Sequence, residues 1–420
     1  MEQTFLFGKH SMKSAYEVVV VGAGPAGCSA AIHLKKLGID VLLVDKSFFP
    51  RDKVCGDGIP LKCFPLLEEL GIKQQVLMDR GYPIRQLNIH TPTGETISYG
   101  NLDDDISPKS MCMARREFDF VLLSQAKKFL SQVELGMEVI RIDKVSENGH
   151  ALLLRERETG HQYEILTRMI IGADGTHSIV SRQKNMVRPI GSDQFIGLRV
   201  YCDNDYFEHK THIIYDKLIL PGYVWLFPIS ENRANIGMVI SKANKRRTGQ
   251  NMVSIFKDIV TSHSVFKGLA KKEEIFSNIN IKVFPLNLGS AKGPRVKDGV
   301  ILIGDAAAFI NPLTGGGIFN AMLSGKHAAL VSAHCLGKND VSENALKIYE
   351  RWWGKTLSPS FFYSSLMKSC LKNEKTASWW LRSCAKNRVN ANIFLSVYGN
   401  PLPRFGPLNP LFLFKVLTAK

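Results

Sequence analysis

The sequence has 420 residues, a length that predicts two or three domains of about 150 residues each. With 45% hydrophobic and 22% charged residues it can build a buried core, which excludes an intrinsically disordered chain. The 54 basic and 38 acidic residues give a net charge of +16, but no nucleic-acid-binding motif accompanies this charge. We therefore expect no nucleic-acid partner.

Neither a leader nor a membrane span is expected. The N-terminal residues lack the long apolar stretch of a signal peptide, and no run approaches the roughly 18–20 apolar residues of a membrane-spanning helix. The eight cysteines form no CxxC pair, so zinc-finger spacing is absent and no metal site is expected. We predict free thiols and a cytoplasmic protein. Residues 1–13 look like an extension, with Met12 as an alternative start.

Residues 17–46 have the pattern of a strand, a tight turn, a helix and a second strand. The β-branched run Val18–Val21 predicts a buried parallel strand, and Ala26–Leu37 has helical apolar spacing before Gly38. A second strand is expected at Val41–Val44. This order of elements predicts an α/β fold of the Rossmann type.

The turn between the first strand and the helix carries the spacing GxGxxG. Gly22 permits the tight turn, Gly24 lets the backbone approach a pyrophosphate, and Gly27 lets the helix pack closely on the strand. Pro25 and Ala26 open the helix, whose first N–H groups and positive dipole end suit a phosphate. A tight turn without a ligand is the alternative.

An acid follows the second strand at the distance expected for a ribose contact. Asp45 lies 18 residues after Gly27, close to the separation of about 20 typical of a carboxylate that binds ribose hydroxyls. Lys46, directly after it, is included among the expected cofactor contacts. In this context the glycine motif predicts a bound dinucleotide.

The middle of the chain predicts a β-rich region that contacts an apolar ligand. Residues 85–111 alternate polar and apolar positions around Thr93-Gly94, a hairpin signal, and strands are expected at Phe195–Tyr201 and Ala234–Ile240. Between these strands, residues 219–228 read ILPGYVWLFP. In an extended chain three aromatic side chains share one face and would cover a flat apolar pocket, unless they only form the core of a sheet: Tyr223, Trp225 and Phe227.

Two later segments offer further contacts to an extended ligand. Residues 169–182 join a short strand to Asp174 and two glycines. In residues 300–325 a buried strand is predicted to end at Gly304-Asp305, followed by a turn rich in Pro and Gly and by a helix from about Ile318. This second segment supplies a carboxylate and a second helix N-terminus.

These three segments resemble the superfamily of flavoprotein monooxygenases and geranylgeranyl reductases, over most of residues 16–335. The resemblance implies a noncovalently bound FAD. It implies that Asp305 contacts the ribityl-phosphate region and that Gly317 and Ile318 lie against the isoalloxazine, with Gly316 as a further cofactor contact.

The same resemblance implies three more cofactor contacts. Asp174 matches a family motif that is as much structural as ligand-binding. Arg115 matches an arginine that approaches the cofactor, with a surface ion pair as the alternative, and the backbone of Val139 matches a position at the adenine end.

Residues 50–60, PRDKVCGDGIP, resemble the geranylgeranyl reductase branch, in which a Lys-x-Cys-Gly segment follows the second strand. In that branch the Cys-Gly backbone meets the flavin, so the resemblance places Cys55, Gly56 and Gly58 at the cofactor. Cys55 is the candidate catalytic residue, as a proton donor or by shaping the pocket. The alternative is a small packing residue.

The aromatic segment also resembles this branch, through its YxWxFP motif, although flavin-dependent halogenases carry a similar WxWxIP segment. Halogenases need a catalytic lysine a short way past the stretch that matches Leu70-Gly71-Ile72. Here Lys73 is too early and the later basic residues are Arg80 and Arg85, which counts against halogenation. Aromatic hydroxylases typically lack Lys-x-Cys-Gly.

The leading hypothesis is therefore an FAD-dependent reductase of carbon–carbon double bonds in a polyprenyl lipid. Because the chain has a single GxGxxG, electrons must come from an external donor, either transiently bound NAD(P)H or a reduced protein carrier. The alternatives are a monooxygenase that hydroxylates or epoxidises an apolar substrate, a halogenase, and a non-enzymatic electron-relay or structural partner.

The C-terminal region is expected to be helical, then Pro-rich after Gly399, and it concentrates the positive charge. Residues 351–420 hold eleven Lys or Arg and the single acid Glu374. They also hold four of the five tryptophans: Trp352, Trp353, Trp379 and Trp380. This mixture suits an anionic membrane surface, so attachment to the inner face of the membrane is one expectation and a solvated face with core aromatics is the other.

Three parts are expected in the chain. They are a discontinuous FAD-binding domain at 14–84, 112–190 and 290–335, a β-rich substrate domain at 85–111 and 191–289, and a helical, basic and aromatic region at 336–420.

Overall fold

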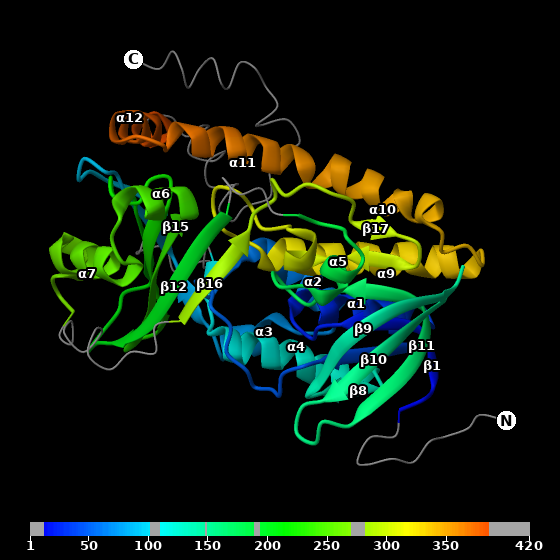
Figure 1. The fold of residues 1–420 in the computed structure, drawn as a ribbon. Helices are drawn as coiled ribbons and strands as arrows, with labels where there is room; N and C mark the ends of the chain where they lie inside the picture. The colour runs from blue at the N-terminus through cyan, green and yellow to red at the C-terminus, as the bar shows by residue number, and fades with distance from the viewer. Residues whose placement is uncertain (1–11, 101–109, 148, 189–193, 270–281, 386–420) are drawn as a thin grey trace.

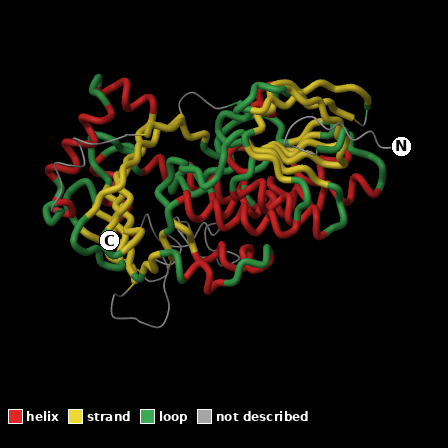
Figure 2. The backbone as a smooth tube through the Cα atoms, turned by 90° about the horizontal axis from the view of Figure 1, so that it is seen from below, coloured by secondary structure: helices red, strands yellow, loops and turns green. Residues whose placement is uncertain are grey.

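The computed structural model describes residues 12–100, 110–147, 149–188, 194–269 and 282–385. Its strands form two large sheets, which are separate groups in Figure 2, and one small sheet. A row of helices runs along one side of both large sheets (Figure 1). The predicted fold class, a Rossmann-type domain with a second β-sheet and C-terminal helices, is confirmed.

The eight-stranded sheet contains the predicted nucleotide fold. Its parallel part has the order β18-β11-β1-β2-β8, because each of these neighbours pairs in parallel. The strands are β1 (Ala15–Val21), β2 (Val41–Asp45), β8 (Val133–Leu135), β9 (Met137–Ser146), β10 (Gly149–Glu156), β11 (Gln162–Gly172), β17 (Val296–Lys297) and β18 (Val300–Leu302). The valines of β1 are almost entirely buried, as a strand covered on both faces requires.

Helices α1 (Pro25–Lys36) and α9 (Ile318–Gly337) pack against each other beside this sheet. The contact is close because Ser29 on α1 donates a hydrogen bond to the carbonyl oxygen of Met322 on α9, at 2.8 Å. The predicted strand-turn-helix-strand of residues 17–46 is thereby confirmed, with α1 beginning one residue early. The remaining helices here are α2 (Phe64–Glu69), α3 (Gln74–Met78), α4 (Arg115–Phe129) and α5 (Ile179–Gln183).

The seven-stranded sheet has the order β16-β12-β15-β14-β13-β5-β6. Its strands are β5 (Gln86–His90), β6 (Thr96–Gly100), β12 (Gln194–Asp203), β13 (Lys210–Ile214), β14 (Tyr223–Ser230), β15 (Arg233–Ser241) and β16 (Lys282–Asn287). The hairpin predicted around Thr93-Gly94 is present between β5 and β6. A small sheet of β3 (Gly58–Pro60), β7 (Ser110–Cys112) and β4 (Tyr82–Ile84) shares no strand pairing with the large sheets and packs against β14.

The two faces of the seven-stranded sheet support different cores, since side chains alternate along β14. Val224 and Leu226 join a core with side chains of α7 (Met252–Ser262). Helix α6 (Lys242–Thr248) directly follows β15 in the chain. Tyr223 and Trp225 join the opposite core, which also contains side chains of α11 (Ser358–Cys370) and α12 (Glu374–Ala385).

Helix α10 (Glu343–Thr356) leads from α9 to α11 and completes the row of C-terminal helices (Figure 1). The helical expectation for this region thus holds up to Ala385. The Pro-rich stretch after Gly399 and most of the N-terminal extension lie outside the described residues.

Candidate functional site

The turn between β1 and α1 leaves room for a ligand at one glycine and none at the other two. Gly22 has φ +106°, and a Cβ added there would lie 2.4 Å from the carbonyl oxygen of Ala173. A Cβ on Gly27 would lie 1.7 Å from the oxygen of Gly22. At Gly24 the nearest atom is a guanidinium nitrogen of Arg51 at 3.4 Å, and no side chain caps α1. The first amides of α1 therefore remain available to a phosphate.

Asp45 braces this turn from the end of β2. It is buried, and its carboxylate accepts hydrogen bonds from the backbone amides of Ala23 and Ser47, both at 2.8 Å. A carboxylate oxygen has lone pairs left beyond one such bond, so a ribose contact is compatible with this role and stays a prediction. Lys46 is exposed, and its carbonyl oxygen accepts a bond from Arg157 at 3.4 Å.

The first turns of α1 and α9 converge on Gly304, the residue before Asp305. A Cβ added to Gly304 would lie 2.9 Å from the Cβ of Ala26 and 3.4 Å from the Cβ of Ala321. The prediction that the strand ends at Gly304-Asp305 is wrong, because β18 ends at Leu302 and Gly304–Ala307 form a short 3-10 helix, η4. The chain turns there since the amide of Gly304 donates to the hydroxyl of Ser324 on α9, at 3.1 Å.

The glycine-rich turn before α9 is open to solvent. Gly315 and Gly316 are exposed. Gly317 is the N-cap residue of α9 and provides no capping side chain, and Ile318, the first residue of the helix, is buried. The two uncapped helix ends and the open glycines fit a long anionic ligand such as FAD, which would span both turns. The predicted contacts of Gly316, Gly317 and Ile318 with the flavin remain predictions.

Asp174 has the structural part of its predicted role. One oxygen accepts bonds from the amides of Ile179 and Val180 at the start of α5, at 2.6 and 3.3 Å. The other oxygen is buried without a hydrogen-bond partner among the described residues, and burial raises the pKa of this carboxyl. Val139 is buried in β9 opposite Leu154, and its contact with the adenine end remains a prediction.

Arg115, the first residue of α4, is not part of a surface ion pair, so that alternative is wrong. It is buried, and its Nε and Nη2 donate to both oxygens of Asp119 at 2.7 and 2.8 Å. Burial lowers its pKa, but Asp119 and Cys55 more than compensate, so the net shift is upward. Arg115 therefore stays a cation close to Cys55.

Residues 51–57, called segment 51–57 below, connect helices α4 and η4 to the seven-stranded sheet, and four of their contacts come from Arg51, Asp52, Lys53 and Cys55. Arg51 pairs with Asp119 of α4 at 3.1 Å, Asp52 with Arg199 of β12 at 2.6 Å, and Lys53 with Asp305 of η4 at 2.7 Å. The carbonyl oxygen of Cys55 accepts a bond from the amide of Asn235 on β15, at 2.8 Å. The segment is thereby fixed to α4 and η4 on one side and to β12 and β15 on the other.

Asp57 is a buried site residue that the sequence prediction missed. It has φ +63° and accepts bonds from the Tyr201 hydroxyl at 2.8 Å, the Asn235 amide at 2.7 Å and the Arg115 backbone amide at 3.3 Å. Desolvation raises the pKa of Asp57 to about 6, although its hydrogen-bond donors oppose the shift. The one signal in the sequence was an acid placed between Gly56 and Gly58.

The aromatic stripe, Tyr223, Trp225 and Phe227, reaches from segment 51–57 to the glycine-rich turn. Ring centroids along it are 6.2 and 6.5 Å apart. A Cβ added to Gly56 would lie 3.2 Å from the Phe227 ring and 3.6 Å from Nε1 of Trp225.

At its other end, the hydroxyl of Tyr223 donates to the carbonyl oxygen of Thr314. Burial raises the pKa of Tyr223 far above its ordinary value, so this hydroxyl stays neutral. The structure thus brings together the Cys55-Gly56 backbone, the stripe and the turn before α9. The stripe's substrate role remains a prediction.

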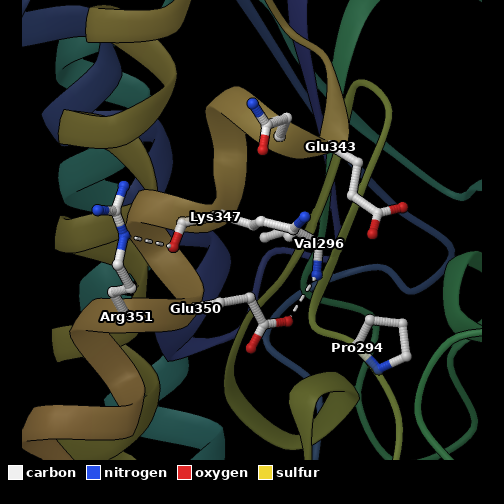
Figure 3. A pocket seen from close by; sticks show the side chains of 7 residues that line it. Pro294, Val296, Glu343, Lys347, Glu350 and Arg351 are labelled. Atoms are coloured by element: carbon white, nitrogen blue, oxygen red, sulfur yellow. Dashed lines mark hydrogen bonds between the residues drawn. The ribbon is translucent and has the colours of Figure 1, made fainter.

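A surface hollow of about 710 Å³ lies elsewhere, beside α10 (Figure 3). Its carboxylate Glu350 accepts a bond from the amide of Val296 at 3.3 Å and one from the Trp353 indole, so it fastens α10 to β17. None of the predicted site residues lines this hollow, and we assign it no ligand.

Known proteins with related sequences include archaeal lipid reductases. Residues 15–329 match the family described as FAD binding domain. A digeranylgeranylglycerophospholipid reductase of Methanosarcina acetivorans is 29% identical, with 87% of this chain and 86% of the relative aligned. Digeranylgeranylglycerophospholipid reductase 2 of Methanopyrus kandleri is 30% identical, with 83% and 85% aligned.

Solved structures share the fold. A geranylgeranyl bacteriochlorophyll reductase-like protein of Thermoplasma acidophilum has a TM-score of 0.80 at 22% identity, covering 94% of this chain and 95% of that one. A flavin-dependent brominase has a TM-score of 0.72 at 20% identity, covering 92% and 94%. Because the FAD-binding family spans most of the chain and a relative reaches 30% identity over 83% of it, the chain belongs to the geranylgeranyl reductase family of FAD-dependent oxidoreductases.

Proposed function

We propose that the chain reduces carbon–carbon double bonds of a polyprenyl lipid. The observation that carries this proposal is the close approach of Gly56, the residue after Cys55, to Trp225 and Phe227, because it sets the Cys55-Gly56 backbone against a flat apolar surface. Reduced FAD bound against the turn before α9 would supply the hydride. The relatives named as digeranylgeranylglycerophospholipid reductases support a lipid with isoprenoid chains.

The chain's own residues would bind the alkene, exclude water and provide a proton. Tyr223 and Trp225 are less than 9% exposed and share a core with α11 and α12, which keeps water from this face. Cys55 is partly exposed and is a free cysteine, so its thiol can donate a proton to the alkene carbon that does not receive the hydride, as can a water molecule. The electron donor, NAD(P)H or a reduced protein, binds from outside.

The test is an anaerobic single turnover. FAD in the purified protein is reduced with dithionite, a geranylgeranyl lipid is added, and the flavin absorbance and product mass are followed. Reoxidation without oxygen, with two hydrogens gained for each bond, is the expected result. A flavin that stays reduced until oxygen enters, with a product that gains an oxygen atom, would instead establish the monooxygenase.

We also propose that the outer side of α11 and α12 rests on an anionic membrane surface. Phe362, Leu366 and Trp379 are 66%, 43% and 37% exposed, and Lys372 and Lys375 beside them are exposed as well. Apolar rings and lysines together suit the headgroup region of such a membrane. Among the described residues, no helix combines the length and apolar character needed to cross a bilayer.

The same two helices contact the aromatic stripe with their inner side, through a core that includes Met367, Leu371 and Trp380. A lipid would thus have a short route from the membrane to the stripe. Of the four tryptophans predicted for the membrane, Trp352 and Trp353 lie on α10, where they pack on His327 and Phe309. Trp380 is buried, so Trp379 is the exposed tryptophan of α12.

Sedimentation with vesicles of anionic and of zwitterionic lipids tests the membrane proposal. The double variant Phe362→Ser and Trp379→Ser should lose most of its binding to anionic vesicles. Phe120→Ser is the matched control, because Phe120 is 37% exposed on α4, away from α11 and α12 (Figure 1). Equal sedimentation of all three proteins would contradict the proposal.

A further inference from the structure

Asn235 is a fully buried amide whose hydrogen-bonding atoms are engaged by groups of the candidate site. Its Oδ1 accepts a bond from Nε1 of Trp225 at 2.9 Å. Its Nδ2 donates to the carbonyl oxygen of Cys55 at 2.8 Å and to Oδ2 of Asp57 at 2.7 Å. One side chain of β15 therefore joins the aromatic stripe to segment 51–57.

Packing alone does not account for an amide at this place. Asn235 lies between the buried Ala234 and Ile236 in a sheet, where an apolar side chain would avoid the cost of desolvating an amide. The amide is tolerated because both of its ends are bonded, and each bond goes to a residue of the candidate site.

Asp57 extends the connection toward the cofactor side. Besides Asn235, its carboxylate accepts the Tyr201 hydroxyl and the backbone amide of Arg115, at the start of α4. A continuous set of hydrogen bonds thus runs from the Trp225 indole through Asn235 and Asp57 to α4. Loss of any member leaves a buried donor or acceptor without a partner.

We infer that Asn235 and Asp57 are positioning residues that fix the Cys55-Gly56 backbone at a set place relative to the Trp225 ring. This inference rests on the proposed function, since Cys55 and Trp225 are taken to flank the alkene. A shift of about 1 Å in such a place can cost about 100-fold in rate without weakening cofactor binding.

Asn235→Asp is the sharpest test, because it preserves the size and the Oδ1 acceptor that Trp225 uses. It replaces the amide nitrogen, which donates to Cys55 and Asp57, with a carboxylate oxygen. That oxygen would repel both the carbonyl oxygen of Cys55 and Oδ2 of Asp57. Asn232→Asp is the matched control: the same change at an exposed residue of the turn between β14 and β15.

The readout is alkylation of Cys55 by iodoacetamide in the FAD-bound protein, measured by peptide mass spectrometry. Cys370 on α11 is also partly exposed and serves as the reference thiol in each sample. Asn235→Asp should raise the Cys55 rate about tenfold relative to Cys370, because lost hydrogen bonds free the segment. Asn232→Asp should leave the ratio unchanged.

If Asn235→Asp fails to fold, Tyr201→Phe provides the second variant, since it removes one donor to Asp57 and keeps the ring. It should raise the Cys55 rate about threefold, in line with the loss of one hydrogen bond. FAD content should stay at the wild-type level in both variants, and kcat should fall with KM nearly unchanged.

Wild-type alkylation ratios in folded, FAD-bound Asn235→Asp or Tyr201→Phe would overturn the inference. If the wild-type protein reduces no polyprenyl lipid but the ratios change as expected, the proposed function fails and the positioning role stands.

Discussion

The ammonium group of Lys53 lies 2.7 Å from Oδ2 of Asp305, with both side chains largely shielded from water. Desolvation would raise the pKa of Asp305, but the charge and hydrogen bond of Lys53 outweigh it and lower the pKa below its usual value. Asp305 is therefore ionised, and Lys53 offsets a negative charge that would otherwise repel an anionic cofactor at the same place.

Lys53→Met should weaken FAD binding by tenfold or more and lower the free energy of unfolding by about 1–3 kcal/mol, because Asp305 is left without its cation. FAD titration and thermal unfolding measure the two effects. Lys144→Met is the control, since Lys144 pairs with Asp298 at 2.9 Å while both are nearly half exposed. Equal FAD affinity in both variants would contradict the role of Lys53.

Gly27→Ala should abolish FAD binding, because the added Cβ would lie 1.7 Å from the oxygen of Gly22 and the turn must open. Gly354→Ala is the comparison, in the last turn of α10 with nothing within 4 Å of the added Cβ. It should retain FAD and gain about 0.5–1 kcal/mol from better helix propensity. FAD absorbance after gel filtration distinguishes the two, and retained cofactor in Gly27→Ala would refute the prediction.

Gly237→Ala should impair catalysis while FAD stays bound. A Cβ at Gly237 would lie 2.1 Å from Cζ2 of Trp225 and 2.5 Å from the carbonyl oxygen of Leu198, so both the indole and the neighbouring strand β12 must shift. Gly237 makes no predicted contact with the cofactor. The expected result is a normal flavin content with a loss of single-turnover rate of about 100-fold. If the variant instead lost FAD but kept the wild-type rate per bound flavin, the prediction would be wrong.

Stability should fall in mild acid because of two buried histidines on the seven-stranded sheet. Nε2 of His90 lies 2.9 Å from Nδ1 of His212, and desolvation lowers their pKa values to about 4 and about 3. Below the unfolded pKa of about 6.5 the unfolded chain binds more protons than the folded one. The free energy of unfolding therefore decreases as pH falls from about 6.5 toward 4, by at most about 1.4 kcal/mol per pH unit for each histidine.

Urea unfolding between pH 7.5 and 5 measures this slope. His212→Gln should make the slope shallower, since one buried histidine no longer titrates, and the remaining slope comes from other histidines with lowered pKa values, His327 among them. A free energy of unfolding that is flat over this range would show that the histidines are not responsible.

Elements with local signals were predictable from the sequence. The strand at Val18–Val21, the following helix and the hairpin at Thr93-Gly94 each depend on residue spacing within a short stretch, and each is present. The alternation that put Tyr223 and Trp225 on one face is likewise confirmed by their common core.

Contacts between distant residues were not predictable in this way. Asp57 meets Tyr201 and Asn235 across 144 and 178 positions of the chain, so no local pattern indicates that they bond. The end of β18 was missed for the same reason, because its turn depends on Ser324 of α9. Composition also cannot distinguish an exposed tryptophan from a buried one. Trp379 is exposed, whereas Trp380, the next residue, is buried.

Within segment 51–57, Arg51, Asp52, Lys53 and Cys55 contact four different elements. A single inserted or deleted residue would move every later partner out of reach, whereas one substitution removes a single contact. The length of this segment is therefore more constrained than the identity of any one residue in it. Changes of chain length that the protein tolerates should fall in surface turns, such as the one at Gly160, instead.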